Sequence, residues 1–120
     1  MAQAVLYNSL AAILNTSPST YSKTAATILN AWFVDRQTGM NPHVQYGQVV
    51  RGPGTQTGSF MGVLDLRGMI QVLNGVQVLK LANASTWTPY LESQMQIWVA
   101  KYDNWMTSSD TGRKAGDAAK

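Results

Sequence analysis

The chain has 120 residues with a formal net charge of +3, 45% hydrophobic and 12% charged residues, so it can build one modest core and no second domain of ordinary size. The nine basic residues are scattered, which argues against nucleic-acid binding because phosphate recognition needs clustered Lys and Arg. A surface that is polar but mostly uncharged suits ligands with many hydroxyl groups, such as sugars.

Several residue types that build common sites are scarce. The chain has no cysteine and a single histidine, His43, which argues against disulfides, thiol catalysis and the usual two-histidine metal sites. We therefore expect neither a bound metal nor a cofactor. No apolar run approaches the roughly 18 residues that a membrane span needs, and the first residues lack the basic start of a secretory signal. We expect no membrane partner.

The first periodic segment predicts an amphipathic helix over residues 2–15. Turn residues follow, and Ser19 or Thr20 can cap a second helix that runs to about Val34 and buries Trp32 and Phe33 at its end. The short linker makes these two helices an antiparallel hairpin. The stripe expected to be buried on the first helix consists of Leu6, Leu10, Ile13 and Leu14.

Residues 35–64 are rich in glycine and proline, which excludes a long helix there. Scattered apolar side chains are numerous enough to hold the segment on a helical scaffold, so we expect irregular chain with short extended stretches around residues 44–50. Loops of this length in a compact domain are usually functional or disordered.

A third helix is expected from Asp65 to about Leu81. Gly68 and Gly75 lie seven residues apart on one face of it and cost about 1 kcal/mol each relative to alanine. We therefore expect them to let a neighbouring helix approach closely.

A fourth helix is expected to follow a turn, with Thr86 or Thr88 as its cap and Pro89 in its first turn. Its apolar stripe reaches Met106, and after Thr107 we expect frayed chain with nothing large to bury. Together these elements predict an all-α fold of two helical hairpins joined by a long Gly-rich loop.

Side chains that can carry chemistry are concentrated in that loop. Amides, an imidazole, a phenol and a guanidinium can bind sugar hydroxyls and a carboxylate. The same groups can instead tie down the loop's own backbone, and an arginine there is equally a surface charge. Of the four tryptophans only Trp87 falls at a turn, and the other three are expected in the core. The candidate substrate-binding residues are Asn41, His43, Tyr46, Gln48 and Arg51.

Four segments in a fixed order carry a resemblance to a known family. They are Ala-Trp-Phe-Val-Asp at 31–35, Thr-Gly-Met-Asn-Pro-His-Val-Gln-Tyr-Gly-Gln at 38–48, the Gly-rich turn at 52–58, and Gly-Val-Leu-Asp at 62–65. This order resembles the N-terminal half of the alginate lyase domain family.

The resemblance implies an incomplete toroid of α/α hairpins, of which residues 1–120 would form a part. It also implies a secreted or periplasmic polysaccharide lyase that cleaves uronic-acid polymers by β-elimination, with an acidic polysaccharide as partner. The family's catalytic Asn-His motif would begin after Lys120, so we expect no catalytic residue in this chain and a role in the substrate cleft. The alternative is a non-catalytic carbohydrate-binding or structural helical module.

Overall fold

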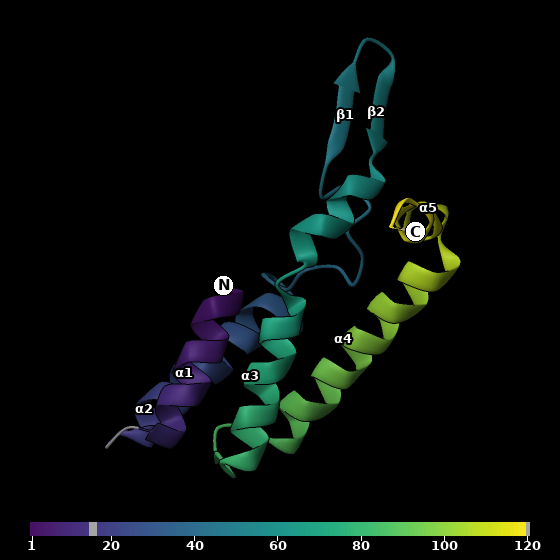
Figure 1. Cartoon of the computed structure of the whole chain (residues 1–120). Helices are drawn as coiled ribbons and strands as arrows, with labels where there is room; N and C mark the ends of the chain where they lie inside the picture. The colour runs from purple at the N-terminus through teal and green to yellow at the C-terminus, as the bar shows by residue number, and fades with distance from the viewer. Residues whose placement is uncertain (15–16, 120) are drawn as a thin grey trace. The chain divides into compact units, whose positions relative to one another are not determined.

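The computed structural model describes residues 1–14 and 17–119 (Figure 1). The described residues form mostly helices, with one small antiparallel sheet, so the predicted all-α class is confirmed. The predicted end of the first helix at Asn15 lies outside the described residues. The helices are α1 (Ala2–Leu14), α2 (Pro18–Leu29), α3 (Met69–Leu81), α4 (Pro89–Ser108) and α5 (Asp110–Ala118), and the strands are β1 (Val49–Gly52) and β2 (Thr55–Gly58).

The chain divides into two compact units, which we describe separately. The first comprises Met1–Met40 and Gly68–Gln96, and the second comprises Asn41–Arg67 and Ile97–Lys120. The helix α4 therefore begins in the first unit and ends in the second.

In the first unit, α1 packs against both α2 and α3. A Cβ atom at Gly68 would lie 3.0 Å from the Cβ of Ala2, and one at Gly75 would lie 2.9 Å from Cγ1 of Val5. The earlier glycine contacts the earlier residue of α1 and the later glycine contacts the later one, so α1 and α3 run in the same direction. The expectation that these glycines admit a close neighbour is confirmed.

This close approach corrects the buried face expected for α1. The helix buries Val5, Ser9 and Ala12 instead of the predicted leucine and isoleucine stripe, and Leu14 is 82% exposed. Only small or compact side chains fit between two helix axes that glycines bring together. The periodicity therefore identified a helix but not the side it buries.

A π-helical turn, Asn30–Val34, extends α2 to the residue predicted as the helix end. It also overturns the expectation that Trp32 is in the core, because Trp32 is 44% exposed while Phe33 is buried. A π turn holds more residues than an α turn, so the side chains after Leu29 are rotated relative to a continuous α-helical stripe.

Residues 35–64 contain more regular structure than expected. The strands β1 and β2 pair antiparallel, with Gly52 opposite Thr55, and Gly54 between them has φ 76°. Proline followed by a glycine with positive φ is typical of a type II turn. The extended stretch is therefore centred later than residues 44–50.

The third helix also begins later than predicted. Asp65 lies within a 3₁₀ helix, Phe60–Leu66. Ser59 caps this helix, because its Oγ accepts a hydrogen bond from the backbone N–H of Met61 at 3.2 Å. The α-helix starts at Met69 and ends at Leu81, where the predicted end is confirmed.

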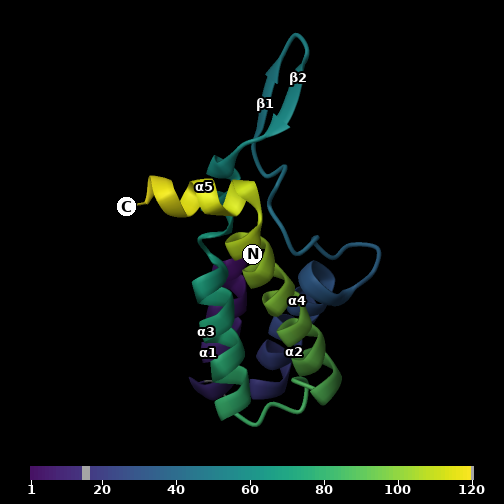
Figure 2. The same ribbon diagram turned by 90° about the vertical axis from the view of Figure 1, so that its right-hand side faces the viewer.

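The start of α4 follows its sequence signals. Oγ1 of Thr88 accepts a hydrogen bond from the backbone N–H of Leu91 at 3.2 Å, and Pro89 occupies the first helical position. The predicted apolar stripe is buried at Leu91, Met95 and Trp98. Figure 2 shows the turn that joins α3 to α4.

The segment after Thr107 is helical, which corrects the expectation of frayed chain. Oγ of Ser109 accepts a hydrogen bond from the backbone N–H of Gly112 at 3.0 Å and so caps α5. Asp110 in the first turn forms an ion pair of 2.9 Å with Arg113. A side-chain cap and an acid near the N-terminus stabilise a helix even without large apolar residues.

None of the described helices has the length and apolarity of a membrane span.

Glu92 joins the end of α3 to the start of α4. Its carboxylate accepts hydrogen bonds from Nζ of Lys80 at 2.7 Å, from the indole N–H of Trp87 and from Nε2 of Gln96 at 3.0 Å. The bond from Lys80, followed by that from Trp87, holds the pKa of Glu92 below its usual value.

We expect Glu92→Gln to lower the free energy of unfolding at pH 7 by up to about 1 kcal/mol, as for other partly exposed ion pairs. The folded-state pKa lies below the unfolded one, so this stabilisation is present above the unfolded pKa and is lost as the pH falls through the folded pKa. Urea denaturation across this pH range should show the two proteins converging in acid. A difference that persists in acid would contradict the assignment.

Candidate functional site

All five candidate substrate-binding residues lie in the second unit. The segment that carries them is held against the chain leading into the 3₁₀ helix by three glycines. A Cβ at Gly47 would lie 3.3 Å from the Cα of Gly62, one at Gly62 would lie 2.8 Å from the carbonyl oxygen of Val44, and one at Gly58 would overlap the carbonyl of Gln45. The backbone N–H of Ser59 also donates to the carbonyl of Gln48 at 2.8 Å. Glycine therefore lets two backbones lie in direct contact and fixes the segment.

His43 is the candidate that is drawn into the protein. Its ring lies 6.1 Å from that of Trp105, with 40° between the planes. The atom Nδ1 is buried and has no hydrogen-bond partner. A buried polar atom without a partner is costly unless a ligand or water satisfies it.

Trp105 belongs to a row of stacked rings along α4. Its ring centroid lies 5.9 Å from that of Tyr102, which in turn lies 5.6 Å from that of Trp98. Burial raises the pKa of Tyr102, so its phenol stays protonated at neutral pH and is not a ready base. Through Trp105 this row of rings holds the ring of His43 in place, and with it the start of the segment that carries the candidates.

The other candidates are exposed. Asn41 lies at the surface and Tyr46 is 66% exposed. Gln48 donates a hydrogen bond of 3.4 Å from Nε2 to Oδ1 of Asp65, which ties it to the 3₁₀ helix. Arg51 lies on β1, and its side chain is exposed.

The electrostatics of this segment favour an anion. The sequence has no acidic residue between Asp35 and Asp65, and the segment that carries the candidates includes Arg51. Among the described residues Arg51 forms no ion pair. Its guanidinium is therefore available to an anionic ligand.

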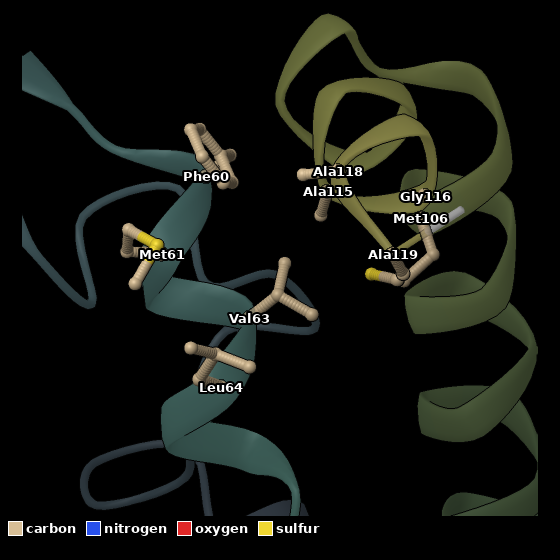
Figure 3. A pocket seen from close by; sticks show the side chains of 9 residues that line it. All are labelled: Phe60, Met61, Val63, Leu64, Met106, Ala115, Gly116, Ala118 and Ala119. Atoms are coloured by element: carbon tan, nitrogen blue, oxygen red, sulfur yellow. The ribbon is translucent and has the colours of Figure 1, made fainter.

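The second unit also contains a cavity of about 410 Å³. Figure 3 shows side chains of the 3₁₀ helix on one side of it and side chains of α4 and α5 on the other. Its lining is apolar and lacks the polar groups that orient a sugar. The lining residues are Phe60, Met61, Val63, Leu64, Met106, Ala115, Gly116, Ala118 and Ala119.

The structure thus brings His43 next to Trp105, and Gln48 next to Asp65. Trp105 was missed as part of the site because its position on the α4 stripe predicted a core residue. Among the described residues, no three His, Asp or Glu side chains are grouped as metal ligands would be.

Comparison with known proteins gives two findings. The family model described as alginate lyase matches residues 1–119. A crystal structure of an alginate lyase from Bacteroides ovatus superposes with a TM-score of 0.85 at 28% sequence identity, over 93% of this chain. The matched region is 29% of that solved chain. No curated protein matches the sequence.

Proposed function

The chain belongs to the alginate lyase family, and we propose that it forms part of the substrate cleft of a polysaccharide lyase that cleaves uronic-acid polymers by β-elimination. The observation that carries the proposal is the polar segment from Asn41 to Arg51, which contains no acid and exposes the side chains of Asn41, Tyr46, Gln48 and Arg51. The guanidinium at its end forms no ion pair with any described residue. A polyuronate offers hydroxyls and carboxylates in a regular array. The partner we propose is therefore an acidic polysaccharide, acted on outside the cell or in a periplasm.

The segment supplies a distinct group for each part of such a polymer. The amides of Asn41 and Gln48 and the phenol of Tyr46 can exchange hydrogen bonds with sugar hydroxyls. The guanidinium of Arg51 matches a carboxylate, to which it can donate charge-assisted hydrogen bonds. His43, supported by Trp105, positions the start of the segment.

β-Elimination on a uronate needs further groups. The carboxylate must be neutralised so that the adjacent C–H becomes acidic, a base must take that proton, and an acid must protonate the leaving oxygen. The only histidine of this chain follows Pro42, so the sequence contains no Asn-His pair. We propose that residues 1–120 are a partial lyase domain that binds the polymer without completing the reaction.

Calorimetric titration of the 120-residue chain with oligouronates tests this role, with a carboxyl-reduced oligomer of the same linkage as the neutral comparison. We expect binding of the acidic oligomer that weakens with added salt, and little binding of the neutral one. Equal affinity for both would contradict the proposal.

A parallel assay follows the absorbance of unsaturated uronate. We expect none to form with the chain alone. Turnover that disappears in His43→Ala would show instead that this chain is itself the lyase.

Tyr46 offers a matched control for the binding role. We expect Tyr46→Ala to weaken oligouronate binding about fivefold, as for loss of a hydrogen bond and a stacking surface of about 1 kcal/mol. Tyr90→Ala removes a tyrosine of similar exposure, 64% against 66%, from the first unit, and should leave binding unchanged. Equal losses in the two variants would remove Tyr46 from the site.

A further inference from the structure

The antiparallel pair β1 and β2 places two side chains directly opposite each other. Its register sets Arg51 against Gln56, and sets Val50 against Thr57. Opposed residues of an antiparallel pair project from the same face, with Cβ atoms about 4.5–5.5 Å apart, and neighbouring pairs alternate between faces. One face of the hairpin therefore carries Arg51 and Gln56, and the other carries Val50 and Thr57.

The turn fixes this register. Two residues, Pro53 and Gly54, connect the strands, and the positive φ of Gly54 closes the turn. At the other end of the hairpin the backbone N–H of Ser59 donates to Gln48 at 2.8 Å. Slippage by one residue would break both features, so the juxtaposition of Arg51 and Gln56 is built into the fold.

The side chains of Arg51 and Gln56 are both exposed. Among the described residues neither forms a side-chain hydrogen bond or ion pair. The hairpin contains no acid that would compete for the guanidinium. An arginine fork and an amide N–H₂ side by side offer donors to both oxygens of one carboxylate.

We infer that Arg51 and Gln56 together bind the carboxylate of a single uronate residue. This inference rests on the proposed function and deepens it. The inference adds Gln56, which sequence analysis did not identify as a candidate. It also proposes that the pair selects a carboxylate-bearing sugar over an uncharged one. The amide fixes one oxygen while the guanidinium binds the other, so the orientation of the carboxylate is set as well as its charge.

A double-mutant cycle on the full chain tests the pairing, with oligouronate binding measured by calorimetry. We expect Arg51→Gln and Gln56→Leu each to weaken binding about tenfold, within the range for a hydrogen bond to a charged group. The affinity of the double variant should be at most about twofold below that of the weaker-binding single variant. The reason is that each single substitution already disrupts the same coupled interaction. Thr57→Val, on the opposite face, is the matched control and should bind like the wild type.

Two further comparisons distinguish carboxylate binding by the pair from general charge attraction. Gln56→Glu keeps the size of the side chain but pairs with Arg51, so we expect it to weaken binding more than Gln56→Leu does. A carboxyl-reduced oligomer should bind equally weakly to the wild type and to Gln56→Leu. Circular dichroism of each variant should match that of the wild type, since both residues are exposed.

The inference is overturned if Gln56→Leu binds like the wild type, if the two single effects multiply to about a hundredfold, or if Gln56→Leu weakens binding of a sulfated polysaccharide as much as that of oligouronate. If any of these results is found while the wild type binds oligouronate and Tyr46→Ala binds it more weakly, the proposed function stands and only the pairing is wrong. If the wild type does not bind oligouronate, both fail.

Discussion

Gly112→Ala is expected to destabilise the second unit by about 2–3 kcal/mol, the upper range for overpacking of a close-fitted site. Gly112 is buried in the first turn of α5, and a Cβ there would overlap the backbone carbonyl of Met106. Backbone cannot yield as a flexible side chain can. The substitution should therefore displace α5 and break the cap from Ser109 to the backbone N–H of Gly112.

The same helix supplies the control. A Cβ at Gly116 would meet nothing within 4 Å, so Gly116→Ala should stabilise α5 by up to about 1 kcal/mol through helix propensity. Urea denaturation followed by far-ultraviolet circular dichroism compares the two variants. Changes of the same sign and size would show that α5 does not pack as described.

Trp105→Ala is the second substitution expected to have a large effect. Its ring centroid lies 6.1 Å from that of His43 and 5.9 Å from that of Tyr102. Trp105 is only half-buried, so we expect a loss of about 2–3 kcal/mol, below the usual cost of truncating a fully buried tryptophan. Oligouronate binding should fall more than tenfold, because the segment after Asn41 loses its anchor.

Trp32→Ala serves as its control, since Trp32 is 44% exposed and lies in the first unit. It should change both stability and binding little. Trp105→Phe should recover part of the loss by restoring an aromatic face. If Trp105→Ala binds oligouronate normally, the aromatic row does not support the binding segment.

The elements that could be predicted from sequence were those with local signals. Thr88 and Pro89 marked the start of α4, and the apolar spacing after Leu91 marked its buried face. The start of α5 also has a local signal, Ser109 followed by Asp110, although the lack of large apolar residues predicted frayed chain there. Pro53 followed by Gly54 is also a local turn signal, but residues 35–64 were predicted as irregular chain with extended stretches around 44–50.

What could not be predicted depends on contacts between distant parts of the chain. The face that α1 buries is decided by Gly68 and Gly75, which contact it from α3. The neighbour of His43 is Trp105, which belongs to α4 and lies far from His43 in the sequence. The candidate residues could be placed in a loop from composition alone, but the pairing of Arg51 with Gln56 needed the strand register.

A backbone-amide NMR titration of the 120-residue chain with an oligouronate tests directly which residues contact the polymer. We predict saturable shift changes concentrated from Asn41 to Arg51 and at Gln56, weakened by salt and absent with the carboxyl-reduced oligomer. Shift changes spread over α1, α2 and α3 with residues 41–56 unaffected, or no change at all, would contradict the claim that this acid-free segment binds an acidic polysaccharide.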